Sequence, residues 1–389
     1  MEPIDATTLP ALPAPFWFIQ VFKVLGFTLH MVPMHLWYVG TTAALLLAWK
    51  GPAQAQRLGA RLMGQMPVLL ALGINFGIVP LLFLQVGYCR AFYPATILMA
   101  WFWLAIIVLL IPAYYGVYVY AGGLKRPAGP GVWHRASGWV SAGLFVVIGF
   151  LFANGMSLTA RPEAWPVLWA RHQVAGAATG TALNLSDPTL WPRWLLMLGL
   201  ALSTTAAWCV TDAFWLAGQE PEEYRRYASK LALVLAIAGA AATTVFGLWY
   251  MAFWSPEVRS AMFGFPLVLL TLATGAGGWL PVAVLAAGQA WRFDRTMAGA
   301  AAGTQLVVLA LNALSRQVVQ NIELRRLLRP GVSAQPVATQ WDSLALFLAA
   351  LVLGAGVIAW ILVQLLRAGQ AAGTSQAPST SSDGGALAR

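Results

Sequence analysis

The sequence predicts an all-α protein, a polytopic membrane helix bundle with about nine transmembrane helices. The chain has 389 residues, of which 59% are hydrophobic and only 9% are charged. A soluble domain carries about a quarter charged residues, so this chain cannot cover a core with polar surface. Apolar runs long enough to cross a bilayer core of about 30 Å also recur between residues 17 and 367. Lipid is therefore the expected solvent.

The expected helices are separated by short segments that contain Gly, Pro and basic residues. Residues 1–16 precede the transmembrane domain, 17–366, as an expected periplasmic segment. Residues 367–389 are rich in Ala, Gly, Ser and Thr, and we expect them to form a disordered cytoplasmic tail. The apolar runs place the helices at about residues 17–48, 66–89, 95–121, 136–160, 192–217, 229–253, 262–289, 298–318 and 343–366.

The basic residues predict the orientation of the chain in a bacterial inner membrane. The net charge is +10, but the 23 Lys and Arg are scattered over short loops, which argues against a nucleic-acid partner. Loops on the side of the C-terminal tail hold 13 of them, and the opposite loops hold nine. Because basic loops stay in the cytoplasm, we expect a periplasmic N-terminus and a cytoplasmic C-terminus.

The longest connection, residues 161–191, is predicted on the periplasmic side and is rich in tryptophan. It contains Trp165, Trp169 and Trp191. Indole rings favour the headgroup layer, where the ring is buried and the N–H still finds an acceptor. We therefore expect this connection to lie at the membrane surface and to form a docking surface for a partner.

Ionisable groups inside a span are candidates for function, because an unpaired charge there costs at least about 2.5 kcal/mol. His30 and His35 lie in the first expected helix, and a neutral imidazole can bind haem iron. Their spacing places them about 140° apart on a helix, so we do not expect them to share one ligand. The alternative, which we weigh equally, is that each imidazole donates to a neighbouring carbonyl and packs between helices.

Three further side chains that could bind a ligand or carry a charge lie inside the expected spans or at their ends. The Met262 thioether could bind haem iron, but methionine more often fills gaps in a core. Asp212 is the carboxylate lying well inside an apolar segment, and it could relay protons or pair with Arg225 or Arg226. We favour the pairing. Lys23 can extend along the first helix to the membrane surface.

Several chemistries find no sequence support. Cys89 and Cys209 form neither CxxC nor CxxCH, so covalent haem attachment and thiolate metal sites are not indicated. Phosphate-binding loops of the GxxxxGK[ST] type, HExxH zinc motifs and GxSxG nucleophile motifs do not occur where those chemistries need them. Nucleotide-driven and hydrolytic activities are therefore not predicted.

Short motifs follow one another along residues 30–317 in a familiar order. They are His30, Pro33 and Gly40; GINFGIV at 73–79; Phe92, Pro94 and LMA at 98–100; ANGM at 153–156; Arg259 and Met262; and SRQ at 315–317. This order resembles subunit I of the cytochrome bd quinol oxidases. The resemblance implies nine helices with the N-terminus outside the cell.

The sequence departs from that family where its oxygen chemistry would reside. Leu196 stands at the position of the low-spin haem b histidine, Thr96 and Leu104 replace two glutamates, and Ala313 replaces a third. The quinol-binding loop is reduced to about eight residues around 254–261. Leucine and alanine neither bind iron nor carry protons, so the resemblance does not extend to oxygen reduction.

What remains of the family's site is His30, at the position of the outer high-spin haem ligand, with Met262 and Arg316. The resemblance therefore implies at most one haem b, with His30 on the iron and Arg316 on a propionate. His35 is retained as a second candidate ligand.

Three functions follow, in decreasing order of support. The first is a bd-like membrane subunit of a bacterial respiratory electron-transfer complex, associated with other membrane subunits and a periplasmic c-type cytochrome. The second is a structural subunit that kept the fold and lost its cofactors. The third is a small-solute transporter, although the sequence shows no internal repeat and no pair of broken helices.

Overall fold

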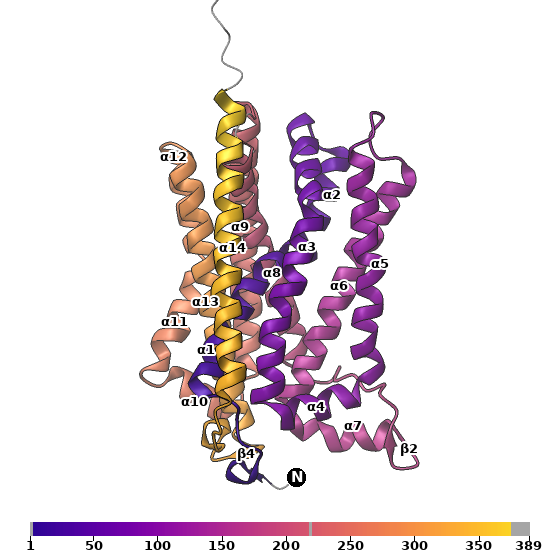
Figure 1. Ribbon diagram of the computed structural model, residues 1–389, viewed down its shortest axis with the longest axis vertical. Helices are drawn as coiled ribbons and strands as arrows, with labels where there is room; N and C mark the ends of the chain where they lie inside the picture. The colour runs from indigo at the N-terminus through magenta and orange to yellow at the C-terminus, as the bar shows by residue number, and fades with distance from the viewer. Residues whose placement is uncertain (1–2, 218–219, 375–389) are drawn as a thin grey trace, which may run out of the picture.

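The computed structural model describes residues 3–217 and 220–374 (Figure 1). Among the described residues, strand pairing consists of two short ladders, β1 (Ile4–Asp5) with β4 (Leu328–Arg329) and β2 (Gln173–Val174) with β3 (Ala177–Ala178), and one isolated bridge between Leu12 and Val337. The helices are α1 (Phe16–His35), η2 (Leu36–Gly40), α2 (Thr41–Lys50), α3 (Ala53–Gly87), α4 (Cys89–Leu98), α5 (Ala100–Leu124), α6 (Val132–Ala160), α7 (Trp165–Arg171), α8 (Leu190–Thr211), η4 (Asp212–Leu216), α9 (Glu222–Ala252), α10 (Pro256–Phe263), α11 (Leu267–Gly277), α12 (Leu280–Ala290), α13 (Arg295–Leu324) and α14 (Trp341–Thr374), with short 3-10 turns η1 (Ala6–Thr8), η3 (Pro162–Ala164) and η5 (Val332–Ala334).

The all-α prediction is confirmed, and nine helical stretches of the described residues are long and apolar enough to cross a membrane. They run side by side along the long axis of the molecule (Figure 1). Large apolar side chains face outward: Ile107 and Val108 of α5 are 60% and 58% exposed. A water-soluble protein rarely exposes so much apolar surface, so these faces are suited to lipid.

Two predicted boundaries are wrong because polar residues continue a helix. The second span begins at Ala53 rather than near residue 66. Its first turns carry Arg57 and Arg61, and both arginines pair with carboxylates of the segment around residues 212–220. Near the C-terminus, α14 continues to Thr374 rather than ending at 366, because Leu, Ala, Gln and Arg favour a helix. The rest of the predicted tail, 375–389, lies outside the described residues.

The end of the bundle that holds β1 also holds α4, α7, α10 and the β2–β3 hairpin (Figure 1). We call it the N-terminal end. Trp165 of the connection 161–191 is not at a surface: it is 9% exposed and donates its indole N–H to the carbonyl of Leu158, 2.8 Å away. Trp169 and Trp191 are 41% and 40% exposed, as a headgroup location requires. The indole N–H of Trp165 therefore finds its acceptor inside the protein, and the location of the connection at the membrane surface stays a prediction.

Small residues bring α8 and α9 into close contact. A Cβ placed on Gly239 would lie 2.3 Å from Ser203 Oγ and 2.7 Å from the carbonyl oxygen of Gly199. Close approach of this kind lets helices associate in lipid, where burying apolar surface gives no driving force. Gly199 and Gly239 therefore fix the distance between two central helices.

We expect Gly239→Ala to destabilise the protein by about 1–3 kcal/mol, because the added methyl must push the two helices apart. Gly143→Ala in α6 is the matched control, since nothing lies within 4 Å of a Cβ there. It should be neutral or stabilising by up to about 1 kcal/mol, because alanine favours a helix over glycine. Unfolding in mixed detergent micelles with increasing dodecyl sulfate measures both. Equal stability of the two variants would contradict the packing described.

Candidate functional site

His30 lies against two glycines of the GINFGIV motif. Its Nδ1 lies 2.9 Å from the carbonyl oxygen of Gly73. A Cβ on Gly77 would lie 2.8 Å from His30 Cε1, and one on Gly73 would lie 2.0 Å from the ring of Trp37. Glycine at both positions therefore opens a groove in α3 that receives the His30 and Trp37 side chains of α1 and η2.

The contact with Gly73 determines which ring nitrogen of His30 carries the proton. A carbonyl oxygen can only accept a hydrogen bond, so Nδ1 of His30 must donate. In the neutral ring Nε2 then has a free lone pair, which is the form of histidine that binds a metal. A carbonyl bonded to Nδ1–H is also the usual arrangement behind a metal-bound imidazole, since it holds the ring in place. His30 is half-buried.

His35 is fully buried and belongs to a second polar group. Its Nδ1 lies 2.9 Å from Thr204 Oγ1 of α8, and the amide nitrogen of Gln305 of α13 donates to the same oxygen over 3.0 Å. Thr204 donates its only hydroxyl proton to the carbonyl of Leu200. Nδ1 of His35 must therefore be the donor, and its Nε2 is a buried lone pair without a hydrogen-bond partner among the described residues.

The two histidines do not converge on one point. His30 contacts α3, whereas His35 contacts α8 and α13. This separation agrees with their spacing on a helix, and η2, a π-helical stretch, begins only after His35. Among the described residues, no group of three or more His, Cys, Asp or Glu is arranged to hold a bare metal ion.

Cations gather one to two helical turns from His30, toward the N-terminal end. The Arg316 guanidinium lies 4.7 Å from the centre of the Phe27 ring, which is one turn from His30 on α1. Lys23 donates to Gln320 Oε1 over 2.7 Å and lies 4.2 Å from the centre of the Tyr88 ring. Lys23 is only 8% exposed, so the prediction that it extends to the surface was wrong: its partners lie inside the bundle.

The carboxylates at this end are held by other arginines. Glu323 accepts from Arg193 over 3.0 Å, and Arg161 lies 3.7 Å from both Glu323 and Asp187. Among the described residues, these ion pairs leave Lys23 and Arg316 without a carboxylate partner. The α1–α13 contact therefore holds two basic side chains with which an acidic group of a ligand could pair.

Tyr88 joins α1 to α13 beside Lys23. Its hydroxyl accepts from Gln20 and from Gln317, each over 2.8 Å, and donates to Asn321. Burial raises the pKa of the Tyr88 phenol, so the group stays protonated at neutral pH and can donate. Sequence reasoning missed this network because its members are amides and one tyrosine spread over three helices.

Met262 does not meet His30. It is fully buried with Trp254, Val258 and Val319, in a cluster between α10 and α13. His30 is bonded to α3. The position of Met262 in this cluster favours packing, rather than iron binding, as the role of its side chain.

Two of the positions that the sequence analysis compares with the bd family lie in aliphatic packing. Leu196 and Ala313 lie in one cluster with Met31, Leu200 and Leu309, where α1, α8 and α13 meet.

Asp212 organises the opposite end of the bundle. It has no exposed surface and receives two hydrogen bonds from Arg61, of 2.8 and 2.9 Å. Gln65 donates to it over 2.5 Å and Tyr224 over 2.8 Å. The expected partners were wrong: Arg226 pairs with Glu222 at the surface, and Arg225 lines a separate cavity. The partner is Arg61, which is 151 residues away in the first turns of α3, a stretch that the sequence predicts as a loop.

Comparison of the sequence with protein-family models gives no match, and comparison with curated proteins gives none. The similarity to cytochrome bd subunit I therefore stays a prediction from short motifs.

We expect Asp212→Asn to destabilise the protein by about 1–3 kcal/mol, because the pair with the buried carboxylate is lost and, among the described residues, Arg61 keeps only Glu220, 3.8 Å away, as an acidic partner. Glu222→Gln is the control, since it breaks an ion pair whose side chains are 65% and 83% exposed. That change should cost less than about 0.5 kcal/mol. Thermal unfolding in one detergent compares the two. Equal midpoints would show that the Asp212 pair contributes nothing.

Proposed function

We propose that this chain is a subunit of a bacterial respiratory electron-transfer complex in the inner membrane, similar to cytochrome bd subunit I but without oxygen reductase activity. The N-terminal end would face the periplasm and the C-terminus the cytoplasm, as the basic loops favour. The subunit would carry one haem b at His30.

The proposal depends on the tautomer that the bond between His30 Nδ1 and the Gly73 carbonyl oxygen sets, a bond that the packing alternative would also form. This tautomer leaves Nε2 as the ligating nitrogen, on a half-buried ring held against Gly77. His35 has the same tautomer, but its Nε2 is enclosed by the core and its ring is tied to Thr204. His30 is therefore the better iron ligand, and His35 is the second choice.

The surrounding charges support an acidic cofactor beside α1. Haem propionates are carboxylates, and Arg316 and Lys23 lack carboxylate partners among the described residues. Lys23 precedes His30 by seven residues, roughly 10 Å along a helix. Arg316 could bind a propionate with two parallel hydrogen bonds, and Lys23 could do so as a point charge.

A bound haem b would supply one-electron transfer. The residues of this chain would hold the iron through His30 and orient that ring through Gly73. They offer no proton path for reducing oxygen at the family's positions, where Thr96, Leu104 and Ala313 stand. Thr96 donates to the carbonyl oxygens of Phe92 and Tyr93 in its own helix, and Leu104 is half exposed.

An electron partner would dock at the N-terminal end. This end presents α7 and the β2–β3 hairpin beyond the ends of the spanning helices (Figure 1). Val167 and Trp169 of α7 are 53% and 41% exposed. A periplasmic c-type cytochrome bound here would lie on the same side of the bundle as Lys23, Arg316 and His30. Other membrane subunits would contact the apolar outer faces.

A structural subunit without cofactors is the second candidate. The close packing of Leu196 and Ala313 favours it, because the bundle is already complete where the family holds its second b-type haem. The Asp212 and Tyr88 networks would in that case only fix the helices relative to one another.

The difference absorption spectrum of the purified protein, reduced minus oxidised, separates the two functions. We expect Soret and α bands of one b-type haem per chain in the wild type. His30→Ala should remove them, because no second ligand converges on the same site. His35→Ala should shift the bands or lower the occupancy without abolishing it, since His35 lies close to the site without sharing it.

His172→Ala is the control, because this histidine lies in the connection at the N-terminal end and bonds Thr181 there. It should leave the spectrum unchanged. A colourless wild type, expressed with an ample haem supply, would contradict the electron-transfer proposal and favour the structural one.

A further inference from the structure

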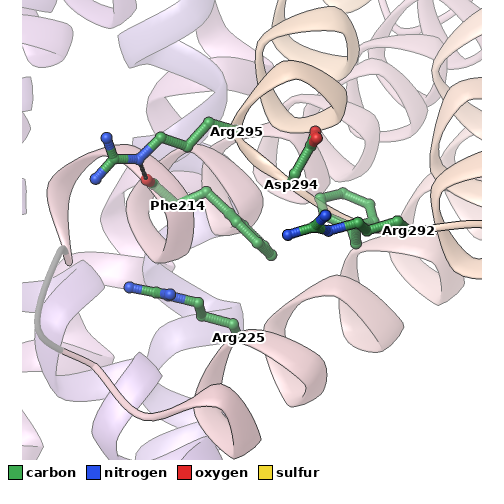
Figure 2. A pocket seen from close by; sticks show the side chains of 6 residues that line it. Phe214, Arg225, Arg292, Asp294 and Arg295 are labelled. Carbon is green, nitrogen blue, oxygen red and sulfur yellow. Dashed lines mark hydrogen bonds between the residues drawn. The ribbon is translucent and has the colours of Figure 1, made fainter.

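A cavity of about 300 Å³ opens at the end of the bundle opposite the N-terminal end. It lies where η4, the start of α9 and the start of α13 come together. Its lining residues are Phe214, Arg225, Arg292, Phe293, Asp294 and Arg295. Figure 2 shows the three arginine side chains arranged around the Phe214 ring. The proposed electron-transfer function uses none of these residues.

Positive charge exceeds negative charge in this cavity. Asp294 is its acidic residue, and this side chain caps α13: Oδ1 accepts the backbone N–H of Met297 over 3.0 Å. Arg295 donates from Nε to the carbonyl oxygen of Phe214 over 3.1 Å, which fixes the guanidinium at the cavity wall. Arg292 is exposed, and neither it nor Arg295 has a carboxylate within ion-pair distance among the described residues.

The start of α13 adds to this positive potential. The first backbone N–H groups of a helix carry partial positive charge and attract anions. The helix begins at Arg295, so its N-terminus and the arginines face the same space. The Arg295 guanidinium, held by the Phe214 carbonyl, and the exposed Arg292 guanidinium together form a site for a compact anion. The N-terminus of α13 adds less, because the Asp294 carboxylate already accepts from Met297 there.

Exposed tryptophans neighbour two of the lining residues in the sequence. Trp291 precedes Arg292 and is 82% exposed; Trp215 follows Phe214, is 44% exposed and donates its indole N–H to the carbonyl oxygen of Arg295 over 3.2 Å. Exposed tryptophans mark the boundary between hydrocarbon and headgroups. The apolar helix α12 ends at Ala290, one residue before Trp291. A ligand in this cavity would therefore sit at the membrane surface.

We propose that this cavity binds the phosphate group of an anionic phospholipid. Guanidinium groups match phosphate oxygens in pairs, and basic pockets between transmembrane helices are suited to lipid headgroups. The acyl chains would then extend along the exposed apolar faces of α9 and α12, where Val234 is 63% exposed. The open cavity mouth and the adjacent tryptophans favour a lipid over free phosphate.

Native mass spectrometry of the detergent-purified protein tests this with two probes, phosphatidylglycerol and inorganic phosphate, and phosphatidylcholine as the zwitterionic comparison without net charge. The wild type should bind phosphatidylglycerol in preference to phosphatidylcholine. The variant Arg292→Gln/Arg295→Gln should weaken phosphatidylglycerol binding about tenfold or more, because each basic residue near an anionic headgroup contributes about 1 kcal/mol.

Arg292→Gln alone serves as a second variant, because Arg292 is exposed and its loss should not disturb folding. It should weaken binding by several-fold. The matched control is Lys125→Gln/Arg126→Gln, which removes two exposed charges from another loop at the same end of the bundle. It should leave phosphatidylglycerol binding within about twofold of the wild type.

Three results would overturn the proposal. One is equal binding of phosphatidylglycerol and phosphatidylcholine by the wild type. Another is an equal loss of phosphatidylglycerol binding in the control and in the Arg292/Arg295 variant. The third is binding of inorganic phosphate that depends on Arg292 and Arg295 without any lipid preference, which would assign the cavity to a soluble anion.

Discussion

A polar group inside a bilayer has no water to bond with, so it must find its partner on another helix of the same protein. This constraint arranges the buried polar groups toward both ends of the bundle. Asp212 meets it with four hydrogen bonds from α3 and α9, and Tyr88 meets it with three from α1 and α13. The outer faces, by contrast, are apolar. The partner of each buried polar group therefore lies on another helix, whatever the distance between the two residues along the sequence.

The same constraint defines the chemistry available to the two histidines. Each ring donates from Nδ1, to a carbonyl in one case and to a threonine hydroxyl in the other, because those acceptors are the ones that α3 and α8 present. The two Nε2 lone pairs then differ only in their surroundings. His30 is half-buried beside two basic side chains, whereas His35 is enclosed. This difference is the reason for proposing His30, rather than His35, as the electron-transfer site.

The helices could be predicted from hydropathy because each span is a local property of about twenty residues. The ion pair between Arg61 and Asp212 could not be predicted from the sequence. The two residues are 151 positions apart, and Arg61 lies in a polar stretch that resembles a loop. Lys23 was misjudged for the same reason: its acceptor, Gln320, is 297 residues away. The motif GINFGIV pointed to His30 through a resemblance, but its physical role, a groove made by Gly73 and Gly77, became visible only in three dimensions.

The central claim is that His30 holds its proton on Nδ1 and keeps Nε2 free to bind iron. Nitrogen NMR of protein labelled with ¹⁵N-histidine in lipid measures this directly, with His30→Gln identifying the signals of that ring among the four histidines. The account predicts a protonated Nδ1 and an Nε2 that is either unprotonated or, in haem-loaded protein, shifted by bound iron. A proton on Nε2 with a bare Nδ1 would contradict it.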